Sequence, residues 1–184
     1  MEDLVQLLLA DPERMKAMEC ARSLALPDCY IAAGFVRNLV WDHLHHKPQP
    51  TPLNDLDIVY FDPNEIDDKA ALIKAALIYE AQLTAMMPEF NWQVRNQANM
   101  HLRNGDKPYQ NTLDAMSYWP EKETAVAARL NEKNQIECIS AFGFESLFRG
   151  YLTWNPERPL VLFRQRLTQK NWLTIWSNLK LVLK

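Results

Sequence analysis

The chain has 184 residues, a formal net charge of -3, and 48% hydrophobic against 23% charged residues. This size and composition predict one domain with a sizeable core, with room for a small appendage. No stretch approaches the roughly 20 consecutive apolar residues of a membrane span. The four glycines are too scattered for the glycine-rich phosphate loops of dinucleotide-binding and Walker-type folds, which excludes both classes.

The cysteines indicate a reducing compartment. Cys20, Cys29 and Cys138 are odd in number and have no C-x-x-C spacing. This disfavours both a disulfide framework and a structural zinc site. The apolar run near the N-terminus has no basic flank before it and no small-residue cleavage site after it. We therefore expect a cytoplasmic protein.

The first third of the chain alternates helical and strand patterns. Asp11 followed by proline predicts an N-cap, with a helix from there to about Leu24. Residues 29–33 predict a short strand that leads through a tight turn at Gly34 into a helix. After a proline-rich loop, residues 55–61 predict a second strand.

The middle of the chain continues this alternation. Residues 70–87 predict the longest helix, and residues 92–94 predict a short strand. Residues 124–130 and 136–140 flank a turn and predict a β-hairpin. We therefore expect an α/β or α+β domain, in which helices pack against a small mixed sheet, with a helical C-terminal extension.

Charge divides the sequence unevenly. Residues 158–184 carry six basic side chains and no acidic one, so all 23 acidic residues lie in residues 1–157. We expect residues 1–157 to form the main domain, and the basic segment to pack on it as one amphipathic helix or as two helices broken near Asn171. Its basic residues interleave with Trp172 and Trp176, a pattern that also suits RNA, an acidic protein or a membrane surface. The acidic remainder would repel a polyanion, so nucleic acid is expected only locally, at this segment.

The main chemical signal is the pair Asp55 and Asp57. A strand alternates its side chains, so both carboxylates project from one face. Such proximity of like charges is favourable only with a cation between them, and oxygen ligands suit Mg²⁺ or Mn²⁺. Alone, so short a motif more often marks two solvated carboxylates at a strand end.

The turn upstream of this pair favours a phosphate ligand. Gly34 permits close approach of a ligand to the backbone where a helix begins, and helix N-termini attract phosphate. Arg37 is suited equally to a contact with phosphate and to an ion pair that fixes the turn. A phosphate cradle followed by paired acids is the combination that a nucleoside triphosphate with its Mg²⁺ requires.

Two segments resemble a known superfamily: A-A-G-F-V-R-N at residues 32–38 and N-D-L-D-I-V at residues 54–59. They resemble the G-G-x-V-R-D and D-x-D signature of the polymerase β-type nucleotidyltransferases, which include the tRNA CCA-adding enzymes. Ala33 stands where the signature has its first glycine, and Asn38 stands where it has aspartate.

A second resemblance spans most of the chain. The box W-Q-V-R-N-Q-A-N-M-H at residues 92–101, followed by W-P-E at 119–121 and T-A-V at 124–126, is similar to a bacterial nucleotidyltransferase-like family. The resemblance implies that Asp55 and Asp57 bind metal and that a third carboxylate comes from a neighbouring strand.

That third position is occupied by an amide. The strand expected to supply the carboxylate carries Gln93, which can coordinate through its carbonyl oxygen but has no negative charge. This substitution weakens a divalent site and removes a possible base. Glu89 or Glu121 is the alternative source of a third acid.

The resemblance as a whole implies a metal-dependent nucleotidyltransferase. The metal would be Mg²⁺ or Mn²⁺, the substrate ATP or another nucleoside triphosphate, and the acceptor a hydroxyl group of a protein, an RNA end or a small alcohol. The residues expected at the site are Asp55, Asp57 and Gln93 for catalysis, and Ala33, Gly34, Arg37 and Asn54 for the nucleotide. The alternative is a non-catalytic module of the same fold that binds nucleotide or a partner, and Gln93 motivates it.

Overall fold

A computed structural model describes residues 2–65 and 69–184 of the chain. The helices are α1 (Glu2–Leu9), α2 (Pro12–Ser23), α3 (Gly34–Leu44), α4 (Lys69–Met86), α5 (Met100–Asn104), α6 (Thr112–Ser117), α7 (Glu145–Phe148), α8 (Leu160–Lys170) and α9 (Trp172–Ile175), with short 3₁₀ turns η1 (Gln97–Asn99) and η2 (Lys122–Thr124). The strands are β1 (Tyr30–Ala32), β2 (Asp55–Tyr60), β3 (Asn91–Asn96), β4 (Val126–Leu130), β5 (Ile136–Ser140), β6 (Tyr151–Thr153) and β7 (Lys180–Val182). Within the described ranges, no helix has both the length and the apolar composition needed to cross a bilayer.

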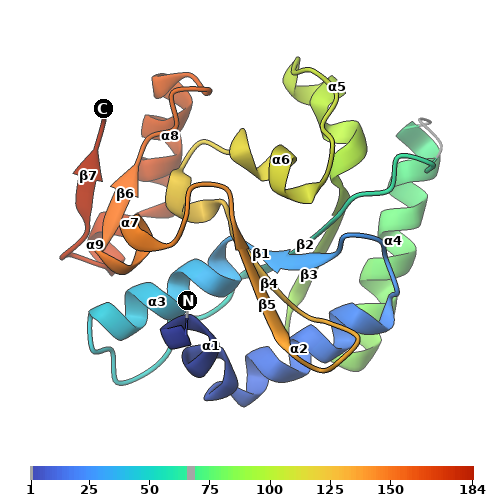
Figure 1. The fold of residues 1–184 in the computed structure, drawn as a ribbon, viewed down its shortest axis with the longest axis horizontal. Coiled ribbons are helices and arrows are strands. Elements are labelled where there is room, and N and C mark those ends of the chain that lie inside the picture. Colours follow the sequence, from blue (N-terminus) through green and yellow to red (C-terminus); the bar gives the residue numbers. More distant parts are fainter. Residues whose placement is uncertain (1, 66–68) are drawn as a thin grey trace.

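The central sheet is mixed. Its five strands lie in the order β3-β2-β1-β4-β5, and only β2 and β3 run parallel. A separate parallel pair joins β6 to β7. Figure 1 shows α2 and α3 on one side of the sheet and α6 and α8 on the other. The predicted small mixed sheet flanked by helices is therefore confirmed.

Strong periodicity located most elements to within a few residues. The predictions match α2, β1, α3, β2, α4, β3 and the β4–β5 hairpin, and the Asp11 side chain caps α2 by accepting a hydrogen bond from the Arg14 backbone N–H at 2.9 Å. In the C-terminal segment the helices break at Asn171, which is left-handed with φ 53°. The chain then ends in strand β7, which the apolar pattern did not indicate. The short α1, α5, α6, α7 and β6 also lack a long enough pattern to be predicted.

The two faces of the sheet differ in what covers them. Ile31, Leu56 and Ile58 point into the main core, which the helices α1 to α4 cover. Ala32 and Val59, which alternate with them, enter a smaller cluster beneath α6. Asp55 and Asp57 have the same strand parity as Val59, so they lie on the face with the smaller cluster.

The turn between β1 and α3 is strained at Ala33, where φ is 55° and ψ is -117°. Side-chain-bearing residues rarely adopt this conformation. Backbone hydrogen bonds hold it: Ala33 donates to the Val126 carbonyl at 2.9 Å and accepts from the Arg37 N–H at 2.9 Å. Gly34 begins α3 without left-handed φ, and a Cβ there would meet its nearest neighbours at 3.5 Å. The tight turn expected at Gly34 therefore lies at Ala33, and Gly34 provides space.

The C-terminal segment is fastened to α3 by tryptophans. The rings of Trp172 and Trp176 pack edge-on against Trp41, with centroids 6.2 and 5.1 Å away. Trp176 Nε1 donates a hydrogen bond to Asp42 Oδ1 at 2.7 Å, and the Thr51 backbone N–H donates to Asp42 Oδ2 at 2.6 Å. All three indoles are almost fully buried, so this segment uses its tryptophans for packing.

Replacing Ala33 by glycine is expected to stabilise the protein by about 1 kcal/mol, because glycine adopts positive φ without steric cost. Urea unfolding followed by tryptophan fluorescence measures the change. Ala32→Gly is the matched control: it lies in regular strand conformation, where glycine costs about 0.5–1 kcal/mol. Equal destabilisation by both variants would contradict strain at Ala33.

Candidate active site

The two aspartates of β2 stand side by side with the predicted amide of β3. In the sheet, Asp57 is the direct partner of Ala32 on β1 and of Gln93 on β3. Asp55 pairs with Asn91, whose Nδ2 donates to Asp55 Oδ1 at 2.6 Å. Strand pairing therefore puts Asp55, Asp57 and Gln93 on one face, as the sequence predicted.

The electrostatics of this face are unfavourable for Asp57 as an anion. Burial raises the pKa of Asp57, and the charge of Asp55 raises it further. The charges of Arg37, Lys170 and Arg166 act in the opposite direction. No salt bridge joins either aspartate to another side chain in the described part of the chain. A cation between the carboxylates would relieve their repulsion.

The donor set fits a hard divalent cation but is incomplete. Two carboxylates and the Gln93 amide oxygen are ligands that Mg²⁺ and Mn²⁺ accept. Over residues 2–65 and 69–184, no group of three or more His, Cys, Asp or Glu side chains is placed to hold a metal. Glu121 is fully buried and bound to Arg166, while Glu89 is exposed and lies near Cys20 on the opposite side of the sheet. Neither glutamate completes the set.

The N-terminus of α3 adjoins the aspartate pair. Ala33 follows Ala32, the sheet partner of Asp57, and its side chain is buried in the smaller cluster. No side chain caps α3, so its first N–H groups have no side-chain acceptor. Gly34 is partly exposed, and Asn54 is exposed directly before β2. Backbone donors therefore lie at a partly exposed turn, where a phosphate would meet the helix dipole.

Arg37 lies in an aromatic enclosure. Its guanidinium stacks between the rings of Trp41 and Trp172, 5.1 and 4.7 Å from their centroids. Nη1 donates to Thr124 Oγ1 at 2.8 Å, and Nη2 donates to Asn38 Oδ1 at 2.9 Å. Nε has no partner in the described part of the chain. Arg37 forms no ion pair with a described residue, so the expected ion pair that fixes the turn is not seen among them, while the expected contact with phosphate stays a prediction.

The charge of Arg37 nevertheless acts on the site. Burial lowers its pKa to about 10, and the charge of Glu121 partly opposes this effect. Arg37 therefore remains cationic at neutral pH. A Cβ atom built on Gly34 would lie 3.5 Å from Arg37 Nη2. A positive charge is therefore adjacent to the first turn of α3.

Two basic residues of α8, Arg166 and Lys170, act on the charge of Asp57, which the sequence pattern did not indicate. Arg166 donates to both carboxylate oxygens of Glu121, from Nε at 2.6 Å and from Nη2 at 3.1 Å. Lys170 follows one helical turn later. Periodicity could have shown that Arg166 and Lys170 share one side of a helix. Only the tertiary structure shows that Arg166 pairs with Glu121 and that the charges of Arg166 and Lys170 act on Asp57.

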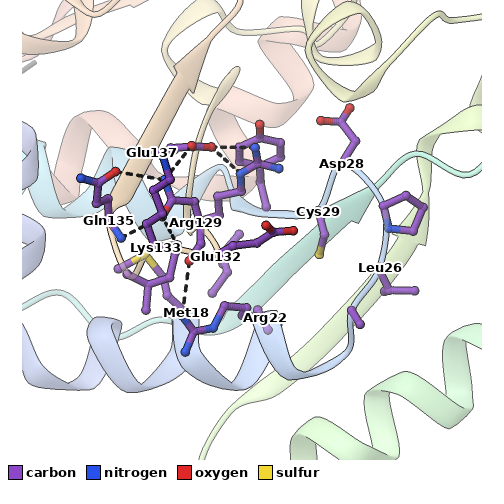
Figure 2. A pocket seen from close by; sticks show the side chains of 17 residues that line it. Met18, Arg22, Leu26, Asp28, Cys29, Arg129, Glu132, Lys133, Gln135 and Glu137 are labelled. Atoms are coloured by element: carbon purple, nitrogen blue, oxygen red, sulfur yellow. Dashed lines mark hydrogen bonds and ion pairs between the residues drawn. The ribbon is translucent and has the colours of Figure 1, made fainter.

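A large pocket lies at the other end of β1 (Figure 2). It encloses about 800 Å³ between the end of α2 and the β4–β5 hairpin, and none of the predicted site residues lines it. Arg129 in its wall is bound to Glu137 at 2.7 Å. Burial raises the pKa of the Cys29 thiol to about 12, so it is not a reactive thiolate at neutral pH. The candidate active site is therefore the aspartate face and not this pocket.

Comparison with known proteins finds matches over nearly the whole chain. Residues 19–181 match the sequence model of a family described as nucleotidyltransferase. A solved structure described as revealing a CCA-adding enzyme head domain aligns with a TM-score of 0.84 and 30% identity, covering 100% of this chain and 96% of that one. No curated protein matches the chain.

More distant structures share the fold. A CCA-adding enzyme in complex with CTP aligns with a TM-score of 0.60 and 14% identity, over 97% of this chain and 43% of that one. An apo form of a tRNA-processing enzyme aligns with a TM-score of 0.53 and 16% identity, over 93% of this chain and 44% of that one. The family match and the 30% identical structure together show that this chain belongs to the nucleotidyltransferase family.

Proposed function

We propose that the protein transfers a nucleotidyl group from a nucleoside triphosphate to a hydroxyl acceptor, with a divalent cation, and releases pyrophosphate. The observation that carries this proposal is the placement of Asp55 and Asp57 beside Gln93 on one face of the sheet, next to the uncapped start of α3. Family membership supports nucleotidyl transfer, and the bound CTP of one distant structural relative supports a nucleotide substrate. The three unpaired cysteines are compatible with action in the cytoplasm.

The roles of the residues follow from their positions. Asp55 and Asp57, with the Gln93 amide oxygen, would hold Mg²⁺ or Mn²⁺, which supplies positive charge to the reacting phosphates when bound. The phosphate would bind beside Gly34, at the first backbone N–H groups of α3. The buried guanidinium of Arg37 adds positive charge next to that position.

The remaining candidates support the site from its edges. Ala33 shapes the turn through its backbone, and Asn54, which is exposed directly before Asp55, would contact a polar group of the nucleotide.

The transfer is a displacement at the α-phosphorus. The acceptor oxygen forms a bond to this phosphorus, the bond from the phosphorus to the α,β-bridging oxygen breaks, and pyrophosphate leaves. The acceptor hydroxyl loses its proton to water, because Gln93 cannot act as a base. A protein side chain, an RNA end and a small alcohol all present such a hydroxyl.

A non-catalytic nucleotide- or partner-binding module is the second candidate, and Gln93 is the observation that favours it. We expect Gln93→Glu to strengthen Mn²⁺ binding, since it restores a third carboxylate beside Asp57. Pyrophosphate release with candidate acceptors separates the two functions. Turnover by the unmodified protein supports the transferase. Binding without turnover, together with turnover gained in Gln93→Glu, supports the module.

Asp57→Asn is expected to abolish metal-dependent triphosphate binding without lowering stability. Burial and the charge of Asp55 raise the pKa of Asp57 above its value in the unfolded chain. Ionisation of Asp57 therefore lowers the free energy of unfolding as the pH rises through the folded-state pKa. Asparagine removes this cost, so Tm should stay constant or rise at neutral pH. Calorimetric titration with Mn²⁺ and ATP measures the binding, and exposed Asp3→Asn is the control. An unfolded Asp57→Asn protein would mean that the pair is structural.

Gly34→Ala is expected to fold normally but to bind triphosphate about tenfold more weakly. The added methyl group makes only ordinary contacts with the protein at 3.5 Å, yet it occupies the space proposed for phosphate. Thermal unfolding and the same titration measure the two effects. Unchanged binding in this variant would place the phosphates elsewhere.

A further inference from the structure

Arg166 is held in one orientation by a buried acid. Glu121 has 0% exposure, and its two oxygens accept from Arg166 Nε at 2.6 Å and Nη2 at 3.1 Å. Such a bidentate pair fixes the guanidinium plane. Arg166 Nη1 forms no hydrogen bond with a described residue. The Nη1 side of the guanidinium therefore has no hydrogen-bond partner among these residues.

The same guanidinium lies beside the site. The guanidinium carbon of Arg166 lies 5.9 Å from the centroid of the Trp172 ring, and that of Arg37 lies 4.7 Å from it. Arg37 in turn lies directly beneath Gly34, at the start of α3. The contact with Trp172 therefore brings a cation of α8 close to the turn at which a phosphate would bind.

Lys170 extends this cationic side. It lies four residues after Arg166 on α8, which places the two on one side of the helix. Lys170 is exposed and has no salt bridge to any described residue. Lys170 therefore projects from the side of α8 that carries the Arg166–Glu121 pair.

Acids also lie near these cations. Glu121 pairs with Arg166, and the charges of Glu121, Asp57 and Glu123 act on Arg37. None of the salt bridges among the described residues involves Lys170 or Nη1 of Arg166, so these two groups remain available to an anion. The aspartates would be occupied by the divalent cation, and a triphosphate bound to it retains excess negative charge.

We propose that Arg166 and Lys170 bind the β- and γ-phosphates of the nucleoside triphosphate, with Glu121 as the positioning residue for Arg166. The inference rests on the proposed function and adds a subsite to it. The subsite selects triphosphates over monophosphates, because a monophosphate at the α-phosphate position does not reach α8. It also holds the two phosphate groups that depart together as pyrophosphate.

The experiment compares affinities for ATP and AMP in the presence of Mn²⁺. Lys170→Ala is expected to weaken ATP binding about tenfold and to leave AMP binding unchanged, because it removes one charged contact to the distal phosphates. Arg166→Lys keeps the positive charge but loses the bidentate guanidinium geometry. It should likewise weaken ATP binding and leave AMP binding unchanged. Glu121→Gln should lower the ATP preference as well. Arg164→Ala, an exposed residue on the same helix, is the matched control and should change neither affinity.

The outcomes separate this subsite from packing and from the proposed function. Arg166→Ala is avoided because it would leave the buried Glu121 charge unpaired, whereas the exposed Lys170 can be removed without that cost. ATP binding that is unchanged in Lys170→Ala and Arg166→Lys would overturn the subsite alone, and so would equal losses of ATP and AMP binding. Absence of ATP binding by the unmodified protein would overturn the proposed function and the subsite with it.

Discussion

The stacking of the buried Arg37 guanidinium between Trp41 and Trp172 is the constraint on which the arrangement of the site depends. A buried cation that has no ion pair with the described residues is costly unless hydrogen bonds and aromatic faces replace its water. Thr124 and Asn38 provide those hydrogen bonds, and each comes from a different part of the chain. Arg37 therefore joins α3, the approach to β4 and the C-terminal segment at one point.

This junction explains how the C-terminal segment is held against α3. Trp172 contacts Trp41 and Arg37, and Trp176 donates to Asp42, so α9 cannot leave α3 without exposing several aromatic rings. The helix before it, α8, is consequently fixed on the α6 side of the sheet (Figure 1). The packing that buries the tryptophans also places Arg166 of α8 beside Trp172 and Glu121.

The part of the site that depends on local pattern could be predicted from the sequence. Alternation along β2 fixed the shared face of Asp55 and Asp57, and Gln93 was correctly expected on the adjacent strand. The Glu121–Arg166 pair could not be predicted, because it joins segments distant in sequence and depends on how α8 packs. The backbone strain at Ala33 could not be predicted for a different reason. Alanine normally avoids positive φ, and here hydrogen bonds to neighbouring elements hold the residue in that conformation.

The amide at Gln93 changes the charge balance of the whole site. On the proposed function, two carboxylates and not three face the cation, while Arg37, Arg166 and Lys170 lie around the same face. Fewer acids weaken the hold on a free divalent ion, and the surrounding cations repel it further. The same cations attract a metal that arrives already bound to a triphosphate, because that complex is an anion. On the proposed function, the absence of a third carboxylate and the basic residues of α8 would therefore act in the same direction: both would make metal binding depend on the nucleotide.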